Sequence, residues 1–362
     1  MKPLVLPHGG YGLGNELLPL GKAYLIAKEC HGKLLDISWR DNKRDYNKYF
    51  KTPWFDPLLR RFLWRTIPRI SFPVTLSSHD LRAQIKTFCH THNLYKRSSP
   101  CLVTVTGIDG GPETVLHAKD YLFKRLLNTS FTLDNLLLIN SALDSNKLII
   151  GVHIRLGDFY EIGSRSYAGV VNTRLPVNWY TKVILDLYKR LGRNNVQVVL
   201  ATDSPLSTEI REIERITDCF VISRIPNSDV SDLLALAKSD LLICSSSTYS
   251  MWAASLGNPY YIWYEPNLLE ISRGFCLNLA QLRSDLAEEF AGRKSPTNIA
   301  SHHLYPKTTL SCLDTSAYRG YPVSDSGHIP EDLSNALTRR FAERHSSRDL
   351  VRGGVFSSIP PE

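Results

Sequence analysis

The sequence has 362 residues, of which 43% are hydrophobic and 22% are charged, and it carries a net charge of +8. This composition is that of an ordinary globular protein and excludes a disordered or fibrous chain. A single hydrophobic core rarely fills so long a chain, so we expect two domains of about 150 residues each. The positive charge favours an anionic partner but does not choose among such partners.

The N-terminal sequence MKPLVLPHGG interrupts its apolar residues with Pro7, His8 and two glycines, and no run of about 18 apolar residues follows. We therefore expect no signal anchor and a cytoplasmic location. The seven cysteines are odd in number and scattered, without a CxxC pair or zinc-ligand spacing. They predict reduced thiols and no zinc site.

Basic residues are interleaved with aromatic residues between Trp39 and Arg69. Such a stripe can bind nucleic acid, but it does not contain the sequence motif of a known nucleic-acid-binding module. We favour a solvated helix face together with an acceptor-side surface, and we expect no nucleic-acid partner. The same basic surface leaves peripheral association with a membrane open. The sequence gives no indication of the oligomeric state.

The first strand is predicted at Leu4–Leu6, followed by a glycine loop and a helix from Glu16 to His31 with apolar residues at helical spacing. Lys33–Ile37 is predicted as the next strand, and this β-loop-α-β opening implies a parallel sheet. Four prolines then divide residues 50–75 into short pieces without a clear pattern.

The second half of the chain opens with a continuous apolar run at Asn146–Ile154, as expected for a strand buried on both faces of a parallel sheet. We predict helices at 177–191, 205–216, 229–238 and 249–256, and strands at 197–201, 219–223 and 240–244. This alternation predicts a doubly wound Rossmann-like domain, whose ligands bind beyond the carboxyl ends of the strands. One further helix is predicted at Pro330–Arg344, followed by a frayed tail.

Three polar signals fall where predicted strands end, and the first is GVHIRLGDF at residues 151–159. It brings His153, Arg155 and Asp158 to the end of a buried strand. An ion pair between Arg155 and Asp158 beside a core histidine would be a purely structural explanation. The functional interpretation is that the arginine fork grips phosphate oxygens and neutralises a diphosphate leaving group.

The second signal is VVLATDSP, where Asp203 follows a strand, and the third is LLICSSSTYSMW, where Ser245–Thr248 follow another. Asp203 is either the cap of a helix opened by Pro205 or a carboxylate that accepts two donors from one edge of a guanine. Serines are favoured helix caps. Four hydroxyl residues in a row at a positive helix end also make a phosphate cradle.

The glycine loop HGGYGLGN at residues 8–15 does not match the GxGxxG dinucleotide fingerprint, because the last required glycine would fall on Asn15 or Leu17. The loop also lacks the Gly-Lys-Ser/Thr of a P-loop. A redox enzyme, a kinase and an ATPase are therefore disfavoured.

The segment GGYGLGNELLPLGKAYLIAKECHGKLLD resembles the opening glycine loop and helix of the fucosyltransferases that share an HxRxxD motif, among them the bacterial α-1,2 and the α-1,6 enzymes. HIRLGD, LATDSP and AKSDLLICSSSTYSMWAASLGNP resemble the three later motifs of that group, in the same order. The resemblance covers residues 8–36 and 147–260. Leu156 and Cys244 stand where the α-1,2 group usually has an arginine and an asparagine.

The resemblance implies an α/β fold of GT-B type, with two Rossmann-like doubly wound domains facing across a cleft. Residues 1–145 would form the acceptor-side domain, residues 146–292 the nucleotide-sugar domain, and residues 293–362 a C-terminal extension. The implied activity is an inverting transfer of fucose from GDP-fucose to a carbohydrate hydroxyl, and we expect a linkage of α-1,2 type. The alternatives are a glycosyltransferase for another nucleotide sugar and an inactive carbohydrate-binding protein of the same fold.

By position, the resemblance places Arg155 at the β-phosphate, and His153 and Asp203 at the guanine. It assigns Ser246, Ser247 and Thr248 to the diphosphate. It places Gly12, Gly14 and Asn15 on the opposite side of the cleft.

An inverting transfer needs a base that takes the proton of the acceptor hydroxyl. Asp158 and Glu161 follow Arg155 on the same loop. We expect Glu161 to be the base and Asp158 to orient Arg155. The chain contains no Asp-x-Asp pair, the usual carboxylate arrangement that holds a divalent ion under a nucleotide sugar. We therefore expect transfer to a glycan acceptor without a metal or another cofactor.

Overall fold

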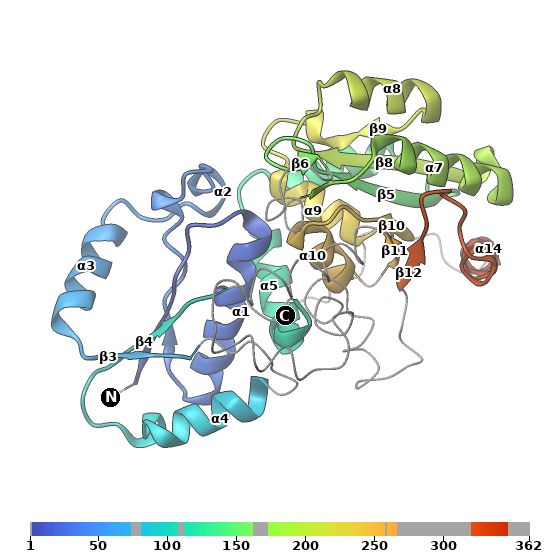
Figure 1. The fold of residues 1–362 in the computed structure, drawn as a ribbon. Coiled ribbons are helices and arrows are strands. Elements are labelled where there is room, and N and C mark those ends of the chain that lie inside the picture. The colour runs from blue at the N-terminus through green and yellow to red at the C-terminus, as the bar shows by residue number, and fades with distance from the viewer. Residues whose placement is uncertain are drawn as a thin grey trace. The chain divides into compact units, whose positions relative to one another are not determined.

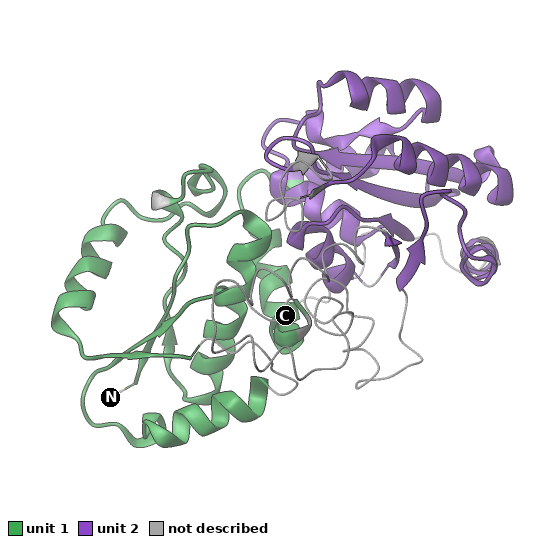
Figure 2. Ribbon diagram, viewed as in Figure 1, with its two compact units in different colours: residues 1–133, 302–315 green, residues 134–301, 316–362 purple. Residues whose placement is uncertain are grey.

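The computed structural model describes residues 2–73, 81–107, 112–161, 173–257, 259–265 and 320–346. The chain divides into two compact units, of which the first reaches to Leu133 and the second begins at Asp134 (Figure 2). Each unit has its own parallel sheet (Figure 1). The α/β class that the sequence predicts, with parallel sheets in two units, is confirmed.

The sheet of the first unit has four parallel strands in the order β2-β1-β4-β3. They are β1 (Leu4–Pro7), β2 (Lys33–Leu34), β3 (Arg69–Ser71) and β4 (Leu102–Val105). The strand predicted at 33–37 ends early, because the backbone then bonds to side chains. The amide of Ile37 donates to Asp36 Oδ1, and the carbonyl of Asp36 accepts from Arg60.

The long helix of this unit, α1 (Leu13–Glu29), begins three residues earlier than predicted. The amides of Asn15 and Glu16 already bond to the carbonyl of Gly12. The other helical segments are α2 (Asn47–Phe50), α3 (Asp56–Thr66), α4 (Leu81–Thr91) and α5 (Lys119–Leu127), with short turns η1 (Trp39–Asp41), η2 (Leu94–Lys96) and η3 (Pro112–Ala118).

The sheet of the second unit has six parallel strands in the order β12-β11-β10-β5-β8-β9. They are β5 (Leu148–Ile154), β8 (Val196–Thr202), β9 (Phe220–Val221), β10 (Leu241–Ile243), β11 (Tyr260–Tyr264) and β12 (Gly320–Val323). Numbered along the chain and read from β9, this order is 3-2-1-4-5-6, which is the dinucleotide-binding arrangement of doubly wound sheets. The pattern of the sequence predicts four of these strands and misses β11 and β12.

The helices of the second unit are α6 (Thr132–Ala142), α7 (Val177–Leu191), α8 (Thr208–Thr217), α9 (Asp229–Ala237), α10 (Thr248–Gly257) and α14 (Glu331–Ser346). Helix α7 contacts α8 and α14, whereas α9 contacts α10, and the two groups cover opposite faces of the sheet (Figure 1). The buried core between α7 and the sheet includes Trp179, Ile184, Ile150 and Leu200. Short turns η4 (Arg193–Asn195) and η5 (Ile222–Arg224) and a separate two-stranded sheet of β6 (Tyr160–Glu161) and β7 (Thr173–Arg174) complete the unit.

Helix α7 has the predicted bounds, and the helix predicted at Pro330–Arg344 is confirmed as α14. The helix predicted at 205–216 begins at Thr208 instead, because the hydroxyl of Ser207 caps it by accepting from the amide of Ile210. The strand predicted at 219–223 stops after Val221, where the chain turns into η5. The predicted frayed tail lies at residues 347–362, outside the described residues.

Two further properties bear on the class of protein. The five cysteines within the described ranges are buried and free. Among the helices that the structure describes, none combines the length and the apolar character needed to span a membrane.

Candidate active site

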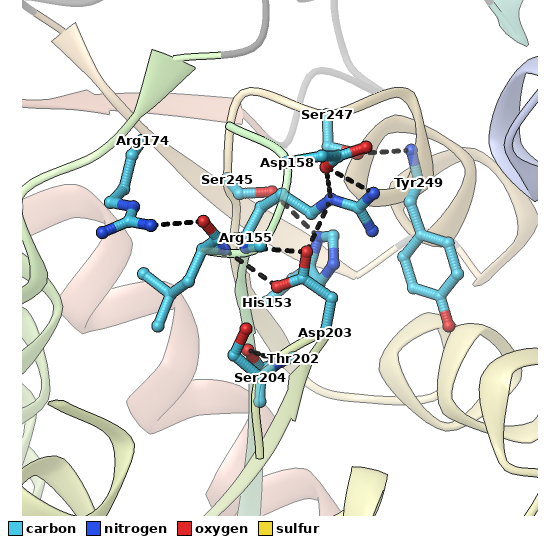
Figure 3. Close-up of polar contacts among 12 residues, drawn as sticks. His153, Arg155, Asp158, Arg174, Thr202, Asp203, Ser204, Ser245, Ser247 and Tyr249 are labelled. Carbon is cyan, nitrogen blue, oxygen red and sulfur yellow. Dashed lines mark hydrogen bonds and ion pairs between the residues drawn. The ribbon is translucent and has the colours of Figure 1, made fainter. Parts of the chain in front are cut away.

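The three polar signals of the sequence meet at one edge of the second sheet, where β5, β8 and β10 have their carboxyl ends (Figure 3). Strand β5 lies between β8 and β10. The strand order reverses between β5 and β10, and ligands of doubly wound sheets bind at such a switch point. The topology therefore gathers polar side chains where a nucleotide would be expected.

Arg155 is the central cation of this edge and is held between two carboxylates (Figure 3). Its Nε and Nη2 atoms donate to Asp158 Oδ1 at 2.9 and 2.7 Å. Its Nε atom also lies 3.1 Å from Asp203 Oδ2, and its guanidinium lies over the ring of Phe159. Among the described residues nothing bonds to Nη1, so one end of the fork is available to an anion.

Asp203 fixes the loop that follows β5. Its two carboxylate oxygens accept from the amides of Leu156 and Gly157, each at 2.9 Å. A Cβ atom at Gly157 would lie 2.7 Å from Asp203 Oδ2, so a glycine is required for this close approach. The alternative that Asp203 caps the following helix is wrong, because Ser207 is that cap.

His153 is buried beneath Arg155, with 4% of its surface exposed. Its Nδ1 atom lies 2.9 Å from the hydroxyl of Ser245 and 2.7 Å from that of Ser250. Burial lowers the pKa of His153 to about 3, and the positive charge of Arg155 acts in the same direction. The ring is therefore neutral, and it joins the end of β5 to the loop after β10.

The loop after β10 runs directly into helix α10. Ser246 is buried, and Ser247 and Thr248 are half-buried. The hydroxyl of Ser247 accepts from the amide of Tyr249 at 3.2 Å, as a helix cap does. Helix N-termini of this kind attract anions through free amides and the helix dipole.

Arg174, Ser250 and Tyr249 belong to this edge although the sequence analysis missed them. The guanidinium of Arg174 donates to the carbonyl of Leu156, and the ring of Tyr249 lies 4.7 Å from that of His153. Their types and spacing gave no signal, because each acts through a contact with a distant segment. The backbone of Glu161 ends β6, whereas its side chain lies outside the described part of the structure.

The predicted glycine-loop residues lie in the first unit, at the start of α1. Gly12 precedes the helix, and Gly14 and Asn15 lie in its first turn. Glu16, which the sequence analysis also missed as a site residue, is fully buried and pins the loop. Its Oε1 atom accepts from the amides of Gly10 and Tyr11 at 2.6 and 2.8 Å, and from Asn42 Nδ2 at 2.8 Å. Burial nevertheless raises the pKa of Glu16.

Leu156 and Cys244, the two residues that differ from the α-1,2 motifs, both have buried side chains. Leu156 belongs to the apolar core of the second unit. Cys244 is buried, and its burial raises the pKa of the thiol. A charged arginine at position 156 would therefore have to leave the core.

No cluster of three or more His, Cys, Asp or Glu side chains with the geometry of a metal site occurs among the residues that the structure describes. The candidate site combines the guanidinium of Arg155, which Asp158 and Asp203 flank, with the N-terminus of α10.

Residues 107–262 match the family model described as glycosyl transferase family 11. The matched range contains all three strand-end motifs, from HIRLGD to the serines before α10. The predicted glycosyltransferase is confirmed by this match. No curated protein sequence matches the chain.

Three solved structures are similar to the chain at low identity. A mutant of FUT1 from Arabidopsis thaliana in complex with GDP is 14% identical, with a TM-score of 0.43 over 72% of this chain and 70% of its own. The fucosyltransferase NodZ from Bradyrhizobium is 14% identical, with a TM-score of 0.43 over 70% and 93%. The apo form of POFUT1 is 13% identical, with a TM-score of 0.45 over 72% and 97%.

Proposed function

We propose that the chain is an inverting glycosyltransferase that moves fucose from GDP-fucose to a carbohydrate hydroxyl, in a linkage of α-1,2 type. The observation that carries the proposal is the guanidinium of Arg155. Asp158 and Asp203 hold it at the switch point of a doubly wound sheet, and its Nη1 has no partner among the described residues. The family match over the same motifs supports the reaction class.

The proposed reaction is favoured by positive charge at the position from which the diphosphate leaves. As the bond between the sugar and the phosphate breaks, negative charge grows on the β-phosphate oxygens. The Nη1 end of Arg155 would stabilise that charge with donors that are already oriented. Ser246, Ser247 and Thr248 at the start of α10 would add hydroxyl and amide donors on the other side of the diphosphate.

The guanine would be held by His153 and Asp203. The neutral ring of His153 uses Nδ1 for Ser245 and Ser250, which leaves Nε2 to a ligand. Asp203 Oδ1 has a second lone pair beyond its bond to the amide of Leu156, whereas Oδ2 already faces both the amide of Gly157 and Arg155 Nε. A donor on one edge of a guanine could share Oδ1 without breaking the loop.

Inversion requires attack from the face opposite the leaving group, with a base on the acceptor side. The carboxylate of Asp158 is occupied by Arg155. Glu161 follows on the same loop and is our candidate for the base. Another nucleotide sugar is the alternative donor, because Leu156 and Cys244 differ from the α-1,2 motifs.

The test measures GDP release from GDP-fucose with and without glycan acceptors, beside thermal shifts with GDP, UDP, ADP and CMP. A nucleotide that binds only the folded protein raises its melting temperature. We expect GDP to give the largest shift and GDP-fucose to release GDP slowly without acceptor. A larger shift with UDP would favour the alternative donor, and binding without any turnover would favour an inactive binding protein.

Arg155→Ala and Arg155→Lys test the residue that carries the proposal. We expect both to lose about 3 kcal/mol or more of transition-state stabilisation, roughly 10²-fold in turnover, because a lysine cannot reproduce the fork. Arg215→Ala is the matched control, since Arg215 forms an exposed pair with Glu212 on α8. Near wild-type turnover in Arg155→Lys would contradict the assignment.

A further inference from the structure

Helix α3 in the first unit exposes its apolar side chains. Phe55, just before the helix, and Leu58, Leu59 and Phe62 follow one another at helical spacing and are 48%, 63%, 41% and 62% exposed. Trp54 precedes them and is 72% exposed. No residue of α3 is buried, and the helix stands at the edge of its unit (Figure 1).

The side of α3 that faces its own unit makes polar and aromatic contacts with it. The guanidinium of Arg60, which pairs with Asp56 one turn earlier in the same helix, donates to the carbonyl of Asp36. Farther along the helix, the ring of Trp64 contacts the ring of His8 and the guanidinium of Arg69. Phe55, Leu58 and Phe62 are nevertheless exposed to solvent, whereas the apolar side of an amphipathic helix usually faces the core. An exposed apolar patch of this kind marks an interaction surface.

The charge around this stripe has one dominant sign. Between Trp39 and Arg69 the sequence has nine Lys and Arg residues and three Asp residues, which accounts for most of the net charge of +8. Arg61 and Arg65 lie one helical turn apart and are exposed. Neither has a hydrogen-bond or ion-pair partner among the described residues. Both also line a hollow beside the glycine loop with Gly9 and Gly10. The patch therefore combines an apolar stripe with exposed cations at its margin.

We propose that α3, together with Trp54 and Phe55, binds the surface of a membrane that contains anionic lipids. A helix with Trp, Phe and Leu on one side and Arg beside them is typical of helices that lie in the plane of the lipid interface. Trp54 would sit at the level of the headgroups, where tryptophan is enriched. Arg61 and Arg65 would contact lipid phosphates.

A second copy of the chain fits this surface less well. In a twofold dimer a patch meets itself, so Arg61 and Arg65 would face the like charges of the partner. Nucleic acid would satisfy the arginines but would leave the stripe of Leu58, Leu59 and Phe62 in water. An anionic lipid surface satisfies both parts of the patch.

The experiment is sedimentation of the full chain with vesicles of phosphatidylcholine and phosphatidylglycerol, against vesicles of phosphatidylcholine alone. We expect binding to the anionic vesicles that weakens as salt is added, because the arginines contribute through screened charge. The double variant Leu58→Ser with Phe62→Ser should lose at least tenfold in vesicle affinity. Arg61→Gln with Arg65→Gln should weaken binding and reduce its dependence on salt.

Leu137→Ser with Leu138→Ser is the matched control, since these leucines of α6 are 65% and 58% exposed and should leave binding unchanged. Leu58 and Phe62 are exposed, so the melting temperature and the GDP binding of that double variant should stay at wild-type values. Vesicle binding is measured independently of fucose transfer, so failure of the membrane proposal and failure of the proposed function can be told apart.

Absence of wild-type sedimentation with anionic vesicles would overturn the proposal. Equal sedimentation of the Leu58→Ser and Phe62→Ser double variant would also overturn it, because another surface would then be responsible. If light scattering shows that the wild type is a dimer and the double variant a monomer, and neither binds vesicles, a second copy is the occupant instead.

Discussion

Arg155 shows how a single site residue is positioned before any ligand binds. Asp158 and Asp203 fix the guanidinium from two sides, and Asp203 also fixes the backbone of the loop that carries it. A preorganised donor loses little side-chain entropy when the ligand binds. Asp158 is therefore expected to matter through the orientation of Arg155, and Asp203 through this orientation as well as through the guanine.

Glu161→Gln and Asp158→Asn separate the base from the residue that orients Arg155. We expect Glu161→Gln to depress turnover while GDP affinity stays unchanged, because only proton transfer is lost. Asp158→Asn should weaken GDP binding as well, since Arg155 loses a charged partner. Titration calorimetry with GDP, beside initial rates, measures both effects. Full activity in Glu161→Gln, or unaltered GDP affinity in Asp158→Asn, would contradict the respective role.

Asp232 is a buried carboxylate beneath the same edge. Its Oδ2 atom accepts from the hydroxyl of Ser223 at 2.5 Å, and that hydroxyl accepts from the amide of Thr202 at the end of β8. Its Oδ1 atom has no hydrogen-bond partner among the residues that the structure describes. Burial raises the pKa of Asp232 to about 7, against the opposing hydrogen bonds from Ser223 and Ser228.

This raised pKa predicts that stability falls as the pH rises. Between an unfolded pKa of about 3.9 and the folded value of about 7, the folded state binds more protons than the unfolded state. The contribution is present below that window and is lost as the pH rises through it. We expect thermal melts from pH 4 to 8 to show a smaller fall in Asp232→Asn than in the wild type. Asp134→Asn, on an exposed residue, should keep the wild-type slope.

At the scale of elements, α14 shows how a segment far along the chain contributes to the core of the second unit. Leu333 and Leu337 are fully buried in the core that lies under α7. Arg340 and Arg344 lie 3.1 and 2.6 Å from the buried carboxylate of Asp240, which precedes β10. The helix is thus bound near the amino end of β10, whereas the candidate site lies at the carboxyl ends of the strands.

Two truncations test this dependence. A chain that ends after Ser346 should keep its melting temperature and its GDP binding, because the sequence beyond it shows no apolar periodicity. A chain that ends after Ile329 removes α14 and should unfold or become insoluble, since it exposes a core and leaves Asp240 without a counter-charge. Circular dichroism and melting curves distinguish the two. A stable, GDP-binding shorter chain would show that α14 is dispensable.

At the scale of the whole molecule, the family match begins in the first unit and ends at β11. The absence of an Asp-x-Asp pair from the sequence and the cations near the predicted diphosphate site both suggest transfer without a divalent ion. We expect fucose transfer to survive EDTA at the wild-type rate. Loss of activity on chelation, with rescue by manganese, would contradict this prediction.

The sequence by itself determined the class of fold, the order of the second-unit elements from β5 to α10 apart from the short β6 and β7, and the three motifs at strand ends. These features are local, because the spacing of apolar residues and the polar residues that follow each strand lie within a few positions of one another. The bounds of α7 could be predicted for this reason. So could Arg155 and Asp203 as candidates, since each follows a strand whose pattern is plain.

Only the tertiary structure decided which side chains meet. Residues 153 and 245 are far apart in the sequence, and they come together because β5 and β10 are neighbours in the sheet. Asp203 proved to be a partner of Arg155 and of two backbone amides instead of a helix cap, and α3 turned its apolar side chains outward. Contacts of this kind depend on strand order and on the packing of distant segments, and local periodicity specifies neither.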